Sequence, residues 1–226
     1  MPSLFATLFV ILSYLIGSIP FGLVIVKLAT GKDIRSVESG RTGGTNAMRA
    51  AGFWAGLSTA LLDGLKAAST VWLARALFPL SDGVENVWLH VLAPLAAILG
   101  HNYSIFLMRR DDHGRLRLRG GAGGAPCVGG SVGLWAPSIF FIIPLGGLML
   151  FGVGYASLAT MSVALFSSLL FCYLAVIGVA PWQYALYGLA AEALLIWSLR
   201  PNIQRLIAGK ERLVGWRAKR RKQAPG

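Results

Sequence analysis

The sequence predicts an all-α polytopic membrane protein, from its composition, its long apolar runs and the placement of its basic residues. Of the 226 residues, 55% are hydrophobic and only 13% are charged, which is about half the charged fraction of an average soluble domain. The apolar runs follow one another too closely to leave room for a sizeable soluble domain. We therefore expect a single membrane-embedded domain over residues 1–226, ending in a basic interfacial tail over about 200–226.

A helix needs about 20 apolar residues to cross the hydrocarbon core of a membrane. The clear candidates for such spans are residues 3–28, 53–78, 86–108, 156–178 and 182–199. The stretch from 123 to 154 is ambiguous, since it fits either one long span or two short spans that are broken near Pro137.

The basic residues help to decide between these two possibilities. Eighteen of the 21 Lys and Arg lie in three segments, namely 32–49, 109–119 and 200–222. Basic segments that border membrane spans mark the cytoplasmic side, so an even number of crossings must separate the second segment from the third. Two short spans, at about 123–136 and 139–153, satisfy this condition. The sequence thus predicts seven transmembrane helices, with the N-terminus out and the C-terminus in. The placement of the basic residues beside membrane spans also argues against nucleic acid as a partner.

The first candidate for a binding site is the polar loop between the first two predicted spans. Its glycines let backbone N–H groups turn towards an anion, and Thr45 or Asn46 can cap a short helix running to Ala51. Its arginines add charge-assisted donors. The alternative is a flexible loop whose arginines only fix the topology, and the residues alone do not decide. The candidates are Ser39, Gly40, Arg41, Gly43, Gly44, Thr45, Asn46 and Arg49.

A second and a third candidate segment follow further along the chain. Arginines at 115, 117 and 119 run into a glycine-rich segment that suits an anion near the membrane surface, although glycines at a helix start also serve close packing. Ser157 and Thr160 lie one helical turn apart, where they either face one cavity or bond back to their own helix. The residues of the second segment are Arg119, Gly120, Gly121, Gly123 and Gly124.

Three isolated polar residues complete the list of candidates. Asp63 and Lys66 are three residues apart on a predicted helix, so they can form an ion pair on one face, and charges inside a membrane are functional suspects. His101 ends the third span, as a capping or cavity residue. Neither a Ser-His-Asp arrangement nor a clustered set of metal ligands is recognisable. We therefore expect no metal and no cofactor.

Taken together, these segments resemble the PlsY family of acyl-phosphate:glycerol-3-phosphate acyltransferases. The matching segments occur in the family's order and cover nearly the whole chain, which makes the combination far more specific than any single glycine loop. They are Gly17–Gly22, Ser39-Gly40, Gly43–Asn46, Arg49, Asp63, Lys66, Gly100-His101, the segment Tyr155, Ser157 and Leu158, and the C-terminal signature from Arg200 to Glu211.

The resemblance implies a PlsY-like seven-helix fold in the inner (plasma) membrane, with an active site that faces the cytoplasm. It implies transfer of an acyl chain from acyl phosphate to the 1-hydroxyl of glycerol 3-phosphate, giving lysophosphatidic acid for phospholipid biosynthesis. Ser39, Arg49, Ser157 and Asn202 are then the expected catalytic residues, and the glycine loops bind phosphate. Membrane lipids are the expected surroundings, and the oligomeric state is open.

Two positions depart from the family pattern. The family's second motif usually reads Gly-Gly-Lys-Gly, but Ala122 occupies the lysine position, and Leu199 stands where the family has histidine. A charged insertion over 111–118 precedes the second motif, so Arg115, Arg117 or Arg119 can be considered as the replacement for the missing charge. The alternatives to the acyltransferase are an altered or inactive family member that binds a phospholipid precursor, and a transporter of a small anionic metabolite.

Overall fold

The computed structural model describes residues 2–80, 85–111, 113–214 and 218, and most of these residues are helical. The α-helices are α1 (Pro2–Ser18), α2 (Phe21–Thr30), α3 (Gly44–Ala51), α4 (Phe53–Leu77), α5 (Glu85–Asn102), α6 (Gly124–Leu134), α7 (Ile139–Leu148), α8 (Ala156–Val176) and α9 (Gln183–Ile207). Short 3₁₀ turns are η1 (Ile34–Ser36), η3 (Ile105–Leu107) and η4 (Ala136–Ser138), and a π-helical turn, η5 (Met149–Val153), extends α7. Strands β1 (Arg109–Arg110) and β2 (Leu116–Arg117) form an antiparallel hairpin.

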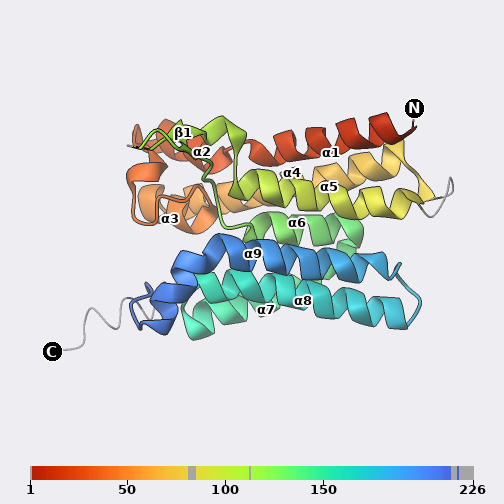
Figure 1. Ribbon diagram of the computed structural model, residues 1–226. Coiled ribbons are helices and arrows are strands. Elements are labelled where there is room, and N and C mark those ends of the chain that lie inside the picture. The colour runs from red at the N-terminus through yellow and green to blue at the C-terminus, as the bar shows by residue number, and fades with distance from the viewer. Residues whose placement is uncertain (1, 81–84, 112, 215–217, 219–226) are drawn as a thin grey trace.

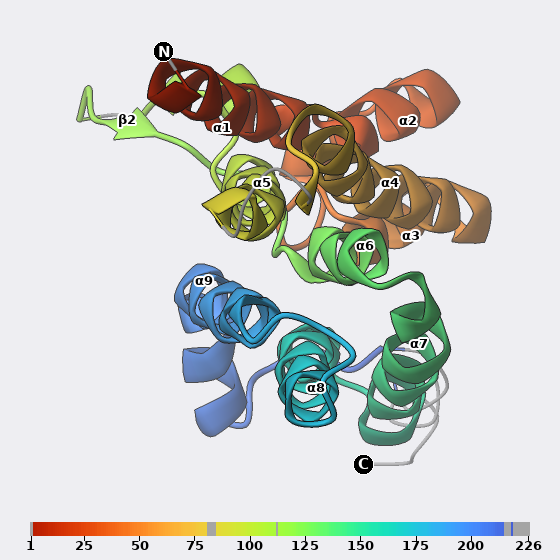
Figure 2. The same ribbon diagram turned by 90° about the vertical axis from the view of Figure 1, so that its right-hand side faces the viewer.

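The long helices lie side by side and run between two ends of the molecule (Figure 1). The N-terminus lies at one end, whereas α2, α3, the β1–β2 hairpin and the C-terminal segment gather at the other. Viewed along the helices, α1, α4 and α5 form one group and α7, α8 and α9 form another (Figure 2). Helix α6 lies between the groups and contacts α4, α5, α7, α8 and α9. The described parts of the three basic segments of the sequence therefore reach one end, as the charge pattern predicts.

The outer surface of the helices is apolar, as a membrane-embedded protein requires. Large hydrophobic side chains are exposed along the helices, and their exposed fractions are 63% for Leu61, 77% for Phe140, 68% for Leu148 and 86% for Val176. Such extensive apolar exposure is rare in a soluble monomer, whereas in lipid it is favourable.

Within the described residues, four helical stretches are long and apolar enough to cross a membrane: Leu4–Thr30, Asn86–Leu107, Ala136–Val153 and Ala156–Val176. Three further helices run alongside them. Helix α6 has only 11 residues, while α4 and α9 have 25 residues each and carry charged residues that lower their hydropathy.

One predicted span contains a break, and one predicted boundary is wrong. The predicted first span, 3–28, corresponds to the apolar stretch Leu4–Thr30, but its helix ends at Ser18 and restarts at Phe21 after Pro20. Proline has no backbone N–H to donate and its ring clashes with the preceding turn, which explains the break. At the other end of the chain, the span expected at 182–199 continues as α9 to Ile207, with Pro201 inside the helix.

The first residues of the predicted basic interfacial tail, 200–207, are therefore the last turns of α9, which turn away from the axis of the earlier part (Figure 2). Residues 215–217 and 219–226 of this tail lie outside the described residues. An internal proline is the ordinary cause of such a bend.

The predicted break near Pro137 is confirmed. The α6 helix ends at Leu134, the 3₁₀ turn η4 contains Pro137, and α7 begins at Ile139. In Figure 2 the chain turns from α6 towards α7. The 123–154 stretch therefore consists of two helical segments rather than one long helix.

The short α6 helix is held against α4 by a close approach of the two backbones. A Cβ atom added to Gly129 would lie 1.9 Å from the carbonyl oxygen of Gly64, so only glycine fits at this position. The buried hydroxyl of Tyr187 in α9 donates a hydrogen bond of 2.7 Å to the carbonyl oxygen of Cys127 in α6. These contacts fix α6, whose first residues form part of the site described below.

Candidate active site

A cavity of about 440 Å³ opens at the end of the molecule where the basic segments gather. Its walls come from both helical groups, which places residues that are far apart in the sequence around one space. The lining residues are Ser39, Arg41, Gly43–Asn46, Met48, Arg49, Phe53, Gly56, Leu57, Ala60, Asp63, His101, Ala122–Ala125, Leu150, Phe151, Ala156, Ser157, Thr160, Leu199, Asn202, Glu211 and Val214.

The first loop leads into α3, which begins at Gly44 and ends at Ala51 as predicted. The capping residue is Gly43, without a side-chain cap, so the predicted capping by Thr45 or Asn46 is wrong. Both residues are already inside the helix, too late to cap it. Asn46 instead folds back, and its Nδ2 donates to the carbonyl oxygens of Ile34, Val37 and Arg41 at 3.2, 3.0 and 2.8 Å. The buried Asn46 therefore shapes the loop that presents Ser39 and Arg41.

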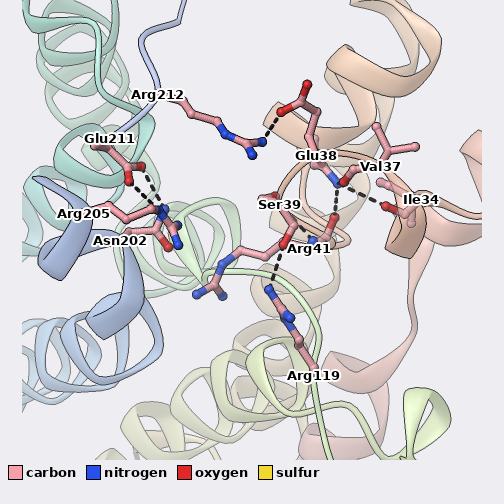
Figure 3. Close-up of polar contacts among 11 residues, drawn as sticks. Ile34, Val37, Glu38, Ser39, Arg41, Arg119, Asn202, Arg205, Glu211 and Arg212 are labelled. Carbon is pink, nitrogen blue, oxygen red and sulfur yellow. Dashed lines mark hydrogen bonds and ion pairs between the residues drawn. The ribbon is translucent and has the colours of Figure 1, made fainter. Parts of the chain in front are cut away.

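Arg41 crosses from this loop to the other side of the cavity. Its Nη1 donates to the carbonyl oxygen of Gly121 at 2.8 Å and to Ser198 Oγ at 3.0 Å, and its Nη2 donates to the carbonyl oxygen of Ser198 at 2.5 Å. In Figure 3 the side chain points from the first loop towards Asn202 and Arg205. Burial, reinforced by the nearby charge of Arg119, lowers the pKa of Arg41 to about 10, so the guanidinium is still cationic at neutral pH.

Arg49 is the second cation on the cavity wall. It lies in the last turn of α3, half-buried. Burial is the main cause that lowers its pKa. Among the described residues, neither a hydrogen bond nor an ion pair holds its guanidinium, which leaves its donors available to a bound anion.

The glycine segment after the hairpin is held by backbone hydrogen bonds. The N–H groups of Gly120 and Gly121 donate to the carbonyl oxygens of Asn102 and His101, each at 2.9 Å. A Cβ atom on Gly121 would lie 1.8 Å from His101 Nε2, so the segment can pass over this ring only as glycine.

The predicted phosphate-binding residues thus divide into two sets. Gly123 and Gly124 line the cavity, together with Ser39, Gly43, Gly44 and Thr45. Gly40, Arg119, Gly120 and Gly121 do not line it. Arg119 donates to the carbonyl oxygen of Ser39 at 2.7 Å and so ties the end of the hairpin segment to the first loop (Figure 3).

The wall opposite the first loop is organised by Glu211. Its Oε1 accepts from Asn202 Nδ2 at 2.9 Å, and its Oε2 accepts from Arg205 Nε at 3.1 Å (Figure 3). Over a longer distance of 3.5 Å, Oε1 also accepts from Ser157 Oγ. Ser157 and Thr160 both line the cavity, which is one of the two alternatives that their spacing allows. Sequence reasoning did not select Glu211 as a site residue, although its position as an acidic residue in a strongly basic segment is a usable signal.

Residues 212–214, just after Glu211, contact the segment at 154–155 and the first loop. The N–H of Val214 donates to the carbonyl oxygen of Gly154 at 2.8 Å, and Leu213 forms a β-bridge with Tyr155. Arg212 forms an ion pair with Glu38 of the first loop (Figure 3). We call residues 211–214 the C-terminal strap.

The floor of the cavity contains a buried polar cluster. Lys66 Nζ lies 2.8 Å from Asp63 Oδ1 and 3.0 Å from His101 Nδ1, and it donates to the carbonyl oxygen of Ile19 at 2.8 Å. The ion pair that the sequence predicts between Asp63 and Lys66 is therefore present. Asp63 and His101 face the cavity, whereas Lys66 lies behind them.

Comparison with known proteins agrees with these features. The model of the glycerol-3-phosphate acyltransferase family matches residues 7–209. A glycerol-3-phosphate acyltransferase of Dehalococcoides mccartyi (strain CBDB1) is 36% identical over 221 residues, which are 94% of this chain and 97% of the relative. One from Rubrobacter xylanophilus is also 36% identical, over 93% of this chain and 96% of the relative.

Solved structures show the same architecture. The crystal structure of PlsY, an integral membrane glycerol 3-phosphate acyltransferase, in its glycerol 3-phosphate form matches with a TM-score of 0.75 and 33% identity, covering 93% of this chain and 96% of that one. Its lysophosphatidic acid form matches with a TM-score of 0.74 and 30% identity, over 93% and 95% of the two chains. The family match and the apolar helical surface lead to one conclusion: this chain belongs to the glycerol-3-phosphate acyltransferase family and is an integral membrane acyltransferase of the PlsY type.

Proposed function

We propose that this protein transfers an acyl chain from acyl phosphate to the 1-hydroxyl of glycerol 3-phosphate, producing lysophosphatidic acid for phospholipid biosynthesis. The observation that carries the proposal is the composition of the cavity. Arg41 and Arg49, two cations without a carboxylate partner among the described residues, face a wall of hydroxyl and amide groups from Ser157, Thr160 and Asn202. Such a cavity suits two phosphate groups and a polyol.

Binding both substrates requires two phosphates to lie close together, and their repulsion must be offset by positive charge. Arg49, Ser39 and the backbone of Gly43 to Thr45 suit the phosphate of glycerol 3-phosphate. The part of the glycine segment that lines the cavity, Ala122 to Gly124, suits the phosphate of the acyl donor. Preorganised cations and backbone N–H groups are worth most where water is partly excluded.

The reaction itself needs no covalent intermediate on the protein. The 1-hydroxyl oxygen attacks the carbonyl carbon of the acyl phosphate, the bond from that carbon to the phosphate oxygen breaks, and the hydroxyl proton ends on the released inorganic phosphate. Because the donor is an activated mixed anhydride, holding the two substrates in the correct orientation supplies much of the rate. Ser157 and Asn202, fixed by Glu211, are placed to orient the acceptor.

The acyl chain requires an apolar path from the cavity to the lipid. Phe53 and Leu57 from α4, and Leu150 and Phe151 from η5, provide apolar side chains on the cavity wall. Phe53 and Phe151 are also exposed on the outer surface, with 60% and 59% of their area accessible. This continuity supports entry of the chain sideways from the membrane.

We further propose seven spans in the inner (plasma) membrane, with the N-terminus out, the C-terminus in and the cavity facing the cytoplasm. The gathering of the basic segments at the cavity end supports this orientation. An A136C variant, made in a C172S background because Cys172 is exposed, places a thiol at the exposed turn between α6 and α7. Labelling from outside the cell is expected, and labelling only from the cytoplasmic side would refute the seven-span topology.

The activity is tested with purified protein in lipid, using radiolabelled glycerol 3-phosphate with either acyl phosphate or acyl-CoA. Lysophosphatidic acid formed only from acyl phosphate is the expected result. Product from acyl-CoA alone would refute the proposed donor. Absence of product from either donor, with folded protein, would refute the enzyme function. Tight phosphate-ligand binding would then indicate an inactive family member, and uptake into proteoliposomes a transporter.

A further inference from the structure

Arg41 is a partly desolvated cation on the wall of the cavity. Its three hydrogen bonds go to neutral acceptors, the carbonyl oxygens of Gly121 and Ser198 and the Ser198 hydroxyl. No carboxylate among the described residues forms an ion pair with it. Charges removed from water are normally paired, and this one lines an open cavity. The arrangement is therefore completed by an anion from outside the protein.

The guanidinium lies between the two positions at which the chain departs from the family pattern. One acceptor, Gly121, directly precedes Ala122, and the other, Ser198, directly precedes Leu199. Both Ala122 and Leu199 line the same cavity as Arg41. Ala122 and Leu199, which offer no charge or N–H donor from their side chains, therefore lie close to the part of the cavity where Arg41 supplies both.

The arginines that sequence reasoning put forward as a replacement for the lysine are committed elsewhere. Arg119 Nη2 donates to the carbonyl oxygen of Ser39. Arg117 pairs with Asp111 on the exposed hairpin, and Arg115 is also exposed there. None of the three lines the cavity among the described residues.

We propose that Arg41 binds the phosphate of the acyl donor and takes over the role left open by Ala122 and Leu199. The inference rests on the proposed function, and it assigns the two cavity cations to different substrates. Arg41, tied to the glycine segment, serves the acyl phosphate, while Arg49, on α3, serves glycerol 3-phosphate. A planar guanidinium that is already fixed by hydrogen bonds on one edge can present its remaining N–H groups to a phosphate.

The test removes the positive charge at position 41 and then restores a positive charge at position 122. In R41Q, which keeps an amide donor but loses the charge, we expect KM for acyl phosphate to rise on the order of 10- to 100-fold, the usual effect of losing a charged hydrogen bond. KM for glycerol 3-phosphate is expected to change by less than about 3-fold. In R41Q/A122K, a lysine on the cavity wall restores the positive charge, and KM for acyl phosphate is expected to recover. R117Q, which removes an exposed hairpin arginine, serves as the matched control.

A purely structural role for Arg41 predicts a different pattern. If Arg41 only ties the first loop to α9, R41Q lowers thermal stability, raises both KM values together and is not rescued by A122K. That result would overturn the proposal. An R117Q variant that impairs acyl-phosphate use as strongly as R41Q would overturn it as well.

Inorganic phosphate gives a readout that does not depend on turnover. We expect phosphate to raise the thermal unfolding temperature of the unaltered protein and of R41Q/A122K. The increase for R41Q is expected to be much smaller, because at a given ligand concentration a weaker-binding ligand stabilises the folded state less. Equal stabilisation of all three proteins would refute anion binding by Arg41. Because this measurement needs no product, its failure is distinguishable from absence of acyl transfer.

Discussion

Glu211 allows the geometry of the site to be tested with two substitutions of different severity. Its side chain is 7% exposed and accepts hydrogen bonds from Ser157, Asn202 and Arg205. Replacement by alanine removes all three acceptor contacts. Replacement by glutamine keeps the Oε1 acceptor for Ser157 and Asn202, but it puts an NH2 group in the place of Oε2 and so loses the hydrogen bond and the ion pair with Arg205.

The expected magnitudes follow from the exposure of each partner. Ser157 is 2% exposed, so leaving it and Asn202 without an acceptor costs about 1–3 kcal/mol. The Arg205 side chain is 44% exposed, so water replaces most of its ion pair and the loss is about 0–1 kcal/mol. We therefore expect E211A to lose roughly 1–4 kcal/mol of stability and to show a raised KM for glycerol 3-phosphate. E211Q is expected to lose about 1 kcal/mol or less, with nearly normal kinetics.

The assay combines acyl-transfer kinetics with thermal unfolding in the same lipid or detergent. E38Q is a matched control, because Glu38 forms an ion pair with Arg212 that is exposed on both sides and contributes little. Damage by E211Q equal to that by E211A would refute the reasoning, since the charge and not the hydrogen-bond acceptor would then be the essential feature. A harmless E211A would refute the role of Glu211 altogether.

Three further predictions concern other parts of the cavity. R49A should lower kcat/KM by at least about 10-fold, the loss of one charged hydrogen bond, while the thermal unfolding temperature stays close to normal; near-normal turnover removes Arg49 from the site. K66M leaves the buried Asp63 carboxylate without its cation and should cost about 3–5 kcal/mol, measured by thermal unfolding. The double variant D63N/K66M should regain part of that stability, and no regain contradicts the ion-pair explanation. G121A should displace His101 or the glycine segment and reduce activity, because its Cβ would lie 1.8 Å from His101 Nε2; unchanged kinetics would show that the segment adapts freely.

The sequence was sufficient for the features that arise from local pattern and charge. The apolar runs predicted helices over most of the chain, the parity of basic segments predicted the break near Pro137, and the spacing of Asp63 and Lys66 predicted their ion pair. Each of these depends on residues that are close together in the chain, or on a rule that applies to the whole protein.

Features that depend on distant contacts could not be predicted in the same way. Asn46 looked like a helix cap, but three carbonyl groups of the preceding loop compete for its amide. Arg119 looked like an anion ligand, but it reaches the carbonyl oxygen of Ser39, 80 positions away. The role of Glu211 depends on the turn that brings it back to Ser157 and Asn202, which no local pattern encodes.

The C-terminal strap has a consequence for the order in which the protein matures. Arg212 contacts Glu38 across 174 positions of sequence, and Glu211 fixes residues of α8 and α9. All of the described helices, α1 to α9, are therefore synthesised before the residues that complete this wall of the cavity. Contacts between such distant positions form late, because a long loop must close first. A chain that ends after Ile207 has these helices but lacks Glu211, so Ser157 and Asn202 lack the acceptor that joins them.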